Sequence, residues 1–296
     1  MTFDRATRRK WFSHGMVVLT GLSIVVVATP LVWIIYETAL LGGSVFNVAL
    51  FTQGIPYPCT PGNGITCHQG GIVVPIEGTL ILVGLAALFS VPIGIGAAIA
   101  SVEYGGQRRW ARITGLVADV LSGVPSIVAG AFVYALLILY DPAIVFSTLS
   151  GSLALAVLML PIVTRACEEA LRTVPHSVRE AAYALGISRW KTSVRIVLVG
   201  ALPGIVTGIL LAIARAAGEA APLLILLGNG CAHSLQGIQD EGCSLSYWIW
   251  LGATNPYQNW ANLAWAAALL LVLIILVLSV ASRLVLDRMA RRMRGG

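Results

Sequence analysis

Long apolar stretches without a single charged residue alternate along this chain with short segments that are rich in arginine. The charge-free stretches are residues 16–36, 78–102, 120–140, 142–164, 196–214 and 262–282. Each approaches or exceeds the roughly 20 residues that a helix needs to cross the hydrocarbon of a bilayer. The pattern predicts six transmembrane helices, near residues 14–40, 73–102, 115–140, 144–165, 203–227 and 262–286.

The overall composition indicates the same class of protein. Hydrophobic residues make up 57% and charged residues 11% of the 296 positions, and the mean hydropathy is +0.86. These values lie far from those of a soluble domain, so we expect an all-α integral membrane protein. The first apolar stretch follows Arg8, Arg9 and Lys10, as in a secretory signal. It is too long for a signal and lacks an A-x-A site, so we expect an uncleaved helix.

The basic residues predict the orientation of the chain. All of them except Arg215 lie in the N-terminal tail, between the second and third predicted helices, between the fourth and fifth, or at the C-terminal end. Segments 42–72, 141–147 and 228–261 contain no arginine or lysine. Because positive residues mark the cytoplasmic side, we expect a multi-pass protein of the bacterial plasma membrane with both termini inside. The net charge of +6 therefore reflects topology, and we expect no nucleic-acid partner.

The cysteines follow the predicted topology. Cys59 and Cys67 share one outer segment, and Cys231 and Cys243 share another, while Cys167 lies alone on the inner side. Four outer cysteines allow three pairings, and an oxidising compartment favours disulfides between the local pairs, Cys59 with Cys67 and Cys231 with Cys243. Four free thiols are the alternative. The spacing of cysteines and histidines matches no standard metal site, so we expect no metal.

The cytoplasmic segment between the fourth and fifth predicted helices is too long and too regularly patterned for a simple connection. Pro175 blocks helix continuation, and Ser177 with Glu180 has the S-x-x-E spacing of a capping box, which begins a helix. Gly186 is placed to end that helix in a left-handed conformation, and Ser188 can cap the next helix. The segment therefore predicts a helix–turn–helix at the inner membrane face, with small alanines that leave a low surface for docking.

The stretch "EAAYALGISRWKTSVRIVLV" resembles the EAA loop of binding-protein-dependent ABC importer permeases. The residues that match the pattern of this family are Glu180, Ala181, Ala182, Gly186, Ile196 and Leu198. Val199 departs from the pattern, because the family has proline there, and Pro203 follows shortly. The resemblance implies a coupling helix that docks onto an ATPase subunit and includes Glu180, Ala181, Ala182 and Gly186. A helix cap alone would account for Glu180 but not for the spacing that continues to Leu198.

Further motifs narrow the resemblance. "GVPSIVAG" (123–130), "LPIVTRACEEALRTVPHSVREAAYALG" (160–186) and "RAAGEAAPLL" (215–224) together are similar to the PstA-type permease family of phosphate-specific ABC importers, from about Gly71 onward. The family has threonine where this chain has Ala220. The resemblance implies the type I, MetI-like permease fold with a cytoplasmic coupling helix. It also implies that the chain forms half of a path for inorganic phosphate.

The chain shows no linker that would divide it into independent units. We expect an N-terminal tail, first helix and outer loop at 1–72, and a five-helix permease core at 73–286 that contains the EAA loop at 165–203. Residues 287–296 then form a basic cytoplasmic tail.

Arg215 and Glu219 are ionisable residues that the apolar pattern does not explain. Counted from Pro203, Arg215 lies twelve residues into the fifth predicted helix, about 18 Å from its start and near the middle of the hydrocarbon. A charge at this depth should face the protein interior or a water-filled cavity, and Glu219 lies one turn further on the same face. A mutual salt bridge is the structural alternative, but removing both charges would be cheaper.

An oxyanion site is therefore the favoured interpretation of this pair. Arginine binds phosphate through a planar fork of donors, and Glu219 can compete for the guanidinium and keep binding weak. The resemblance also points to Arg165, for which an ordinary positive-inside residue is an equal alternative. Ser126 can donate to an oxyanion, although packing is its favoured role.

The chain carries no nucleotide-binding sequence of its own. Neither Lys10 nor Lys191 lies in a G-x-x-x-x-G-K-[ST] loop, so we expect a protein that is not an enzyme and binds no cofactor, with ATP and Mg2+ on partner subunits. The resemblance implies a PstC-type permease partner, two ATPase subunits, an extracytoplasmic phosphate-binding protein and surrounding membrane lipid. The alternatives are an ABC permease for sulfate or molybdate, a secondary anion transporter, and a membrane scaffold without transport.

Overall fold

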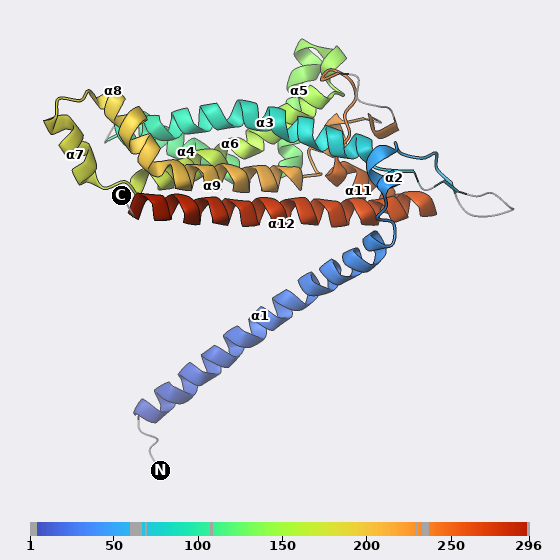
Figure 1. The fold of residues 1–296 in the computed structure, drawn as a ribbon, viewed down its shortest axis with the longest axis horizontal. Coiled ribbons are helices and arrows are strands. Elements are labelled where there is room, and N and C mark those ends of the chain that lie inside the picture. The colour runs from blue at the N-terminus through green and yellow to red at the C-terminus, as the bar shows by residue number, and fades with distance from the viewer. Residues whose placement is uncertain are drawn as a thin grey trace.

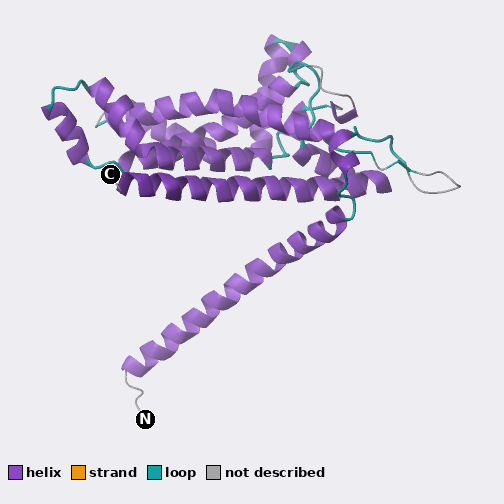
Figure 2. Cartoon of the chain, in the orientation of Figure 1, coloured by secondary structure: helices purple, strands orange, loops and turns teal. Residues whose placement is uncertain are grey.

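A computed structural model describes residues 5–59, 67–68, 70–106, 109–228, 230–232 and 237–294. Within these ranges, every regular element is a helix (Figures 1 and 2). The first part of the chain forms α1 (Arg5–Gly43), α2 (Val48–Thr52), α3 (Val73–Ile99), η1 (Ala100–Tyr104), α4 (Arg109–Gly123), α5 (Ser126–Tyr140) and η2 (Pro142–Ile144). The second part forms α6 (Thr148–Arg172), α7 (His176–Ala184), α8 (Arg189–Lys191), η3 (Thr192–Val197), α9 (Leu198–Ala217), α10 (Leu223–Leu226), η4 (Gly230–Ala232), α11 (Leu245–Thr254) and α12 (Gln258–Arg294).

Five continuous helices in the described part are long and apolar enough to cross a membrane. They are Arg9–Gly43, Val73–Tyr104, Thr148–Arg172, Arg189–Ala217 and Gln258–Arg288. A sixth span is possible if α4 and α5 are counted together. The all-helical membrane class is confirmed, and the number of spans agrees with the six predicted helices when the bent pair is one span.

The third predicted helix is not continuous. The prediction of one helix at 115–140 is wrong, because α4 ends at Gly123, α5 begins at Ser126, and the two helices meet at an angle of 105°. Pro125 occupies the N-cap position of α5 with ψ of 135°, which is not a helical value. Its ring lacks the amide hydrogen that an uninterrupted helix would use, and it disfavours a helical conformation at Val124.

The fifth predicted helix also differs from the expected one. The span begins at Arg189 and ends at Ala217, so the predicted end near residue 227 is wrong. The amides of Gly218 and Glu219 turn back to donate to the carbonyls of Arg215 and Ala216, both at 3.1 Å. Pro222 then precedes the short α10. Arg215 therefore lies in the last turn of α9 and not within an uninterrupted helix.

Helices α3, α6, α9 and α12 form the core of the bundle (Figure 1). Helix α6 is central, since it contacts α3, α9, α4 and α5, and 56% of its apolar window is buried. The side chains of Leu82, Met159 and Ile205, from α3, α6 and α9, are at most 2% exposed. A Cβ on Gly204 would lie 2.8 Å from the Cβ of Ala170, so a small residue is needed for the close approach of α9 to α6.

Helix α1 lies apart from this bundle for most of its length and meets α12 near its own C-terminal end (Figure 1). Its most apolar window is 0% buried, as suits a helix surrounded by lipid. Along the long axis, the first turn of α1 and the last turn of α12 lie toward the end that carries α7 and α8. That both termini are cytoplasmic stays a prediction, as does the division into three segments. Residues 1–4, 295 and 296 of the predicted tails lie outside the described part.

Candidate translocation site and coupling loop

Arg215 and Glu219 form an ion pair at the end of α9. The Nε of Arg215 lies 3.6 Å from the Oε1 of Glu219, and the side chains are 67% and 21% exposed. Within the described part of the chain, this is the one polar contact of the guanidinium. A distance of 3.6 Å exceeds that of a hydrogen bond, so most donors of Arg215 are free to bind another group.

A surface groove of about 380 Å3 runs along this pair. Its remaining lining residues are Leu211, Ala214 and Gly218 from the end of α9, and Ile275 and Ser279 from α12. The walls are mostly apolar, and the two charges and the hydroxyl of Ser279 supply the polar groups. Such a groove combines a cation with the low-dielectric surroundings that strengthen its attraction for an anion.

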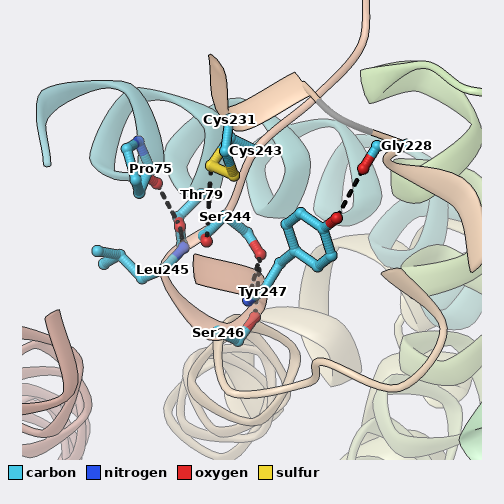
Figure 3. Close-up of a disulfide and its surroundings, with 9 residues drawn as sticks. All are labelled: Pro75, Thr79, Gly228, Cys231, Cys243, Ser244, Leu245, Ser246 and Tyr247. Atoms are coloured by element: carbon cyan, nitrogen blue, oxygen red, sulfur yellow. Dashed lines mark hydrogen bonds between the residues drawn. A yellow bond between two sulfur atoms is a disulfide. The ribbon is translucent and has the colours of Figure 1, made fainter. Parts of the chain in front are cut away.

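Helix α11 holds the backbone of Glu219 in place through Ser246. Ser246, in the first turn of α11, donates its hydroxyl hydrogen to the carbonyl of Glu219 at 2.9 Å. The hydroxyls of Ser244 and Ser246 are 3.1 Å apart, and the Ser244 hydroxyl also accepts from the amide of Tyr247 at 3.0 Å (Figure 3). Ser244 is thus the N-cap of α11, and Ser246 links that helix to the turn after α9.

Two further contacts anchor α11 (Figure 3). The Leu245 amide donates to Thr79 of α3 at 2.8 Å, and the Tyr247 hydroxyl donates to the Gly228 carbonyl at 2.6 Å. Burial raises the pKa of Tyr247, and the negative charge of Glu241 raises it further. The phenol therefore stays protonated and keeps donating at any physiological pH.

Both predicted disulfides, Cys59–Cys67 and Cys231–Cys243, are present. Cys243 lies directly before Ser244, so the second disulfide fixes the loop that leads into α11 (Figure 3). Cys167 is a free thiol, buried in α6.

Arg165 has surroundings that differ from those of Arg215. Its Nη2 contacts Asp119 at 2.5 Å and donates to the Gly115 carbonyl at 2.8 Å, and its Nη1 donates to Glu168 at 2.8 Å. It joins α6 to α4 and is not paired with Glu219. Its role in a path stays a prediction. Sequence reasoning missed Asp119 and Glu168. Asp119 is a lone acid at the edge of an apolar stretch, which is a visible signal, whereas Glu168 is followed by a second glutamate, Glu169.

Ser126 is the first residue of α5, directly after the break at Pro125. It is half-buried, and the structure does not bring it into the groove beside Arg215. Its predicted role as a donor to an oxyanion is therefore untested.

The predicted coupling loop folds as a helix–turn–helix, with one local difference. The capping box is wrong, because α7 begins at His176 and Pro175 holds the N-cap position without a side-chain cap. The φ of Gly186 is +76°, and its amide and the next one donate to the carbonyls of Tyr183 (2.9 Å) and Ala182 (3.1 Å). This arrangement is a Schellman motif, as expected for glycine at the end of a helix.

The surface of α7 combines exposed and buried positions. Glu180, Ala181 and Ala184 are exposed, whereas Ala182 is 4% exposed and packs inward. Ser188 holds the predicted N-cap position of α8 but forms no capping hydrogen bond. Of the three alanines expected on a low docking surface, Ala181 and Ala184 are thus exposed and Ala182 is not, and Tyr183 and Leu185 are exposed beside them. The docking role of this helix stays a prediction.

Residues 90–295 match the family model described as "Binding-protein-dependent transport system inner membrane component". The chain belongs to this family and is a multi-pass protein of the bacterial inner membrane. The fold is that of ABC importer permeases. It matches a chain of the MetNI methionine ABC transporter with a TM-score of 0.60 and 19% identity, covering 73% of this chain and 95% of that one. A chain of a bacterial alginate ABC transporter matches with a TM-score of 0.57 and 15% identity, covering 96% and 98%.

Relatives of higher identity carry a more specific name. The phosphate transport system permease protein PstA 1 of Mycobacterium tuberculosis (strain H37Rv) is 40% identical over 275 residues, which cover 92% of this chain and 86% of the relative. PstA of Yersinia pestis is 40% identical over 255 residues, covering 86% and 83%. PstA of Haemophilus influenzae is 36% identical over 276 residues, covering 93% and 94%.

Proposed function

We propose that this chain is a permease subunit of an ATP-driven importer and forms half of the translocation path for inorganic phosphate. The PstA relatives, which are named for phosphate transport, support this substrate. The observation that carries the proposal is the guanidinium of Arg215, which is 67% exposed in an apolar groove and, within the described part of the chain, has one long contact to a carboxylate.

The geometry of the pair suits an ion that must pass and not remain. Phosphate offers several acceptor oxygens, and the free donors of Arg215 can pair with two of them at once. Glu219 lies close enough to recapture the guanidinium after the ion leaves. Because Glu219 repels an anion and competes for Arg215, binding stays weak enough for release. The position in the last turn of α9 adds the negative end of a helix dipole, which lowers affinity further.

Transport in this proposal requires partners. We assign ATP hydrolysis, and with it ATP and Mg2+, to two ATPase subunits that dock on α7 around Glu180, Ala181 and Gly186. A second, PstC-type permease subunit completes the path, and an extracytoplasmic phosphate-binding protein delivers the ion at the end that carries α11. The chain itself performs no catalysis and binds no cofactor in this scheme.

The decisive experiment is phosphate uptake by the complete complex in proteoliposomes. We expect uptake of radiolabelled phosphate that requires Mg-ATP and the loaded binding protein, and that excess sulfate or molybdate does not reduce. A complex that imports sulfate or molybdate in place of phosphate would overturn the substrate assignment. Uptake by this chain alone, without ATP, would instead indicate a secondary transporter.

A further inference from the structure

A buried ion pair lies outside the translocation site, at the end of the bundle that carries α7 and α8 (Figure 1). Arg179 of α7 contacts Glu103 of η1 through Nη2 at 2.7 Å and through Nε at 3.1 Å. The two side chains are only 10% and 3% exposed. Burying two charges is costly unless their geometry is good, so a pair this enclosed holds its two elements in a defined position.

Arg179 also binds the end of α6. Its Nη2 donates to the carbonyl of Leu171 at 3.0 Å, and its Nη1 donates to the carbonyl of Val174 at 2.5 Å. The last carbonyls of a helix have no partner within the helix, and here a side chain from α7 supplies it. One guanidinium therefore joins α7, α6 and η1.

Glu103 extends the same cluster to the start of the span Arg189–Ala217, which carries Arg215 near its other end. The Ser193 hydroxyl of η3 lies 3.4 Å from the Glu103 carboxylate and 3.0 Å from the Arg189 carbonyl, so its one hydrogen is shared between these two acceptors. Arg189 of α8 donates to the Glu103 backbone carbonyl at 3.3 Å. Glu103 lies in η1 and Ser193 in η3, and both segments are π-helical. Such segments are rare and are often found at functional sites.

We infer that Glu103, Arg179 and Ser193 form a clamp that transmits movement of α7 to α3, α6 and α9. The inference rests on the proposed function, in which ATPase subunits dock on α7. Between α6 and α7 the backbone link is the short turn at 173–175, and between α7 and α8 it is the turn at Gly186. Those turns can bend, whereas the clamp binds α7 rigidly to three helices. Arg179 and Glu103 are positioning residues, because neither lies in the groove beside Arg215.

The test compares Glu103→Gln with Glu169→Gln in the reconstituted complex. Glu169 is an exposed glutamate on α6 near the same end, and its substitution should leave transport unchanged. For Glu103→Gln we expect the ATPase subunits to co-purify normally and phosphate uptake to fall about ten-fold, within the usual range of coupling between sites. ATP hydrolysed per phosphate imported should rise by the same factor. Glu103→Asp keeps the charge and should recover part of the coupling.

The ratio of hydrolysis to uptake separates transmission from folding. A variant that only destabilises the protein lowers the amount of complex but leaves this ratio unchanged, and that result would overturn the clamp. Equal ratios and equal uptake in Glu103→Gln and Glu169→Gln would overturn it as well.

A second measurement does not depend on phosphate. Spin labels at Ser177 and Ile93, which are both exposed and lie away from the proposed docking residues, report the distance between the start of α7 and α3. With an intact clamp, addition of ATP to the assembled complex should leave this distance unchanged, and in Glu103→Gln it should broaden or shift. Identical distributions in both proteins would overturn the clamp. If the unmodified complex imports no phosphate, the proposed function is wrong. The distances between the labels still test the clamp in that case, because they do not depend on transport.

Discussion

Arg165 and Arg215 both lie within apolar spans of this chain, and their surroundings are opposite. Arg165 contacts two carboxylates and a backbone carbonyl, all within 2.8 Å, and its side chain is 35% exposed. Among the described residues, Arg215 has a single carboxylate, at 3.6 Å, and its side chain is 67% exposed. The first guanidinium is already satisfied by the protein, and the second is not. The number of unused donors, more than the presence of a charge in an apolar span, separates a structural arginine from one that is available to a ligand.

The largest effect should follow from Arg215→Gln. We expect uptake to fall about 100-fold or more, because hydrogen bonds to a charged group contribute about 1.5–3 kcal/mol and a fixed charge is lost as well. Arg215→Lys should also transport poorly, since a point charge does not reproduce the fork. Radiolabelled phosphate uptake, with co-purification of the partners as a control for assembly, measures both. Normal uptake by Arg215→Gln would make this arginine structural too.

The next effect is a loss of thermal stability, which we expect when Arg165 is replaced. Arg165→Gln leaves Glu168, which is 2% exposed, without its cation and should destabilise the permease by about 2 kcal/mol. Thermal unfolding in detergent should show a clear decrease in Tm for Arg165→Gln and almost none for Arg215→Gln. An unchanged Tm together with lost uptake would place Arg165 in the path and remove the contrast.

A smaller effect is expected from Glu219→Gln. The substitution removes the competitor of Arg215, so phosphate should bind more tightly and leave more slowly. We expect the maximal uptake rate to decrease about five-fold while assembly remains normal. Rates measured over a range of phosphate concentrations test this, and a simultaneous loss of apparent affinity would argue against the role of Glu219 in release.

The smallest effect should follow from removal of the hydrogen bond that Ser246 donates to the backbone of Glu219. Ser246→Ala removes one hydrogen bond to the Glu219 carbonyl, worth about 1 kcal/mol, and should lower uptake about two- to five-fold. Its Tm should change much less than the Tm of Arg165→Gln. Ser44→Ala, at an exposed serine just after α1, is the matched control. Equal uptake by both variants would show that α11 does not position the site.

Features set by neighbouring residues could be predicted from the sequence. The turn at Gly186 and both disulfides depend on short-range geometry, and each was found where the spacing placed it. The bend at Pro125 and the early end of α9 were missed, because a hydropathy average runs over single prolines and glycines that stop a helix. Pro125 for the bend, and Gly218 with Pro222 for the end of α9, are the residues that could have predicted both features.

Long-range pairings were beyond this kind of reasoning. Arg165 meets Asp119 across 46 positions, and Arg179 meets Glu103 across 76. No local pattern reports which carboxylate will face which guanidinium after the helices pack. The sequence therefore identified Arg215 and Glu219 as unusual, but only the folded chain distinguishes Arg215 from Arg165.

The bend between α4 and α5 has a consequence for biosynthesis. A continuous helix such as α1 satisfies the backbone hydrogen bonds of its membrane-spanning part without help from other helices. The last carbonyls of α4 and the first amides of α5 lack that protection, and in the folded chain α6 contacts both helices while α10 contacts α5. A Cβ on Gly130 of α5 would lie 2.7 Å from the Cα of Pro222, so the two interrupted regions touch. These two regions can therefore reach their final places only after α6 and α10 have been synthesised, so α5 waits for a part of the chain that lies more than 80 residues later.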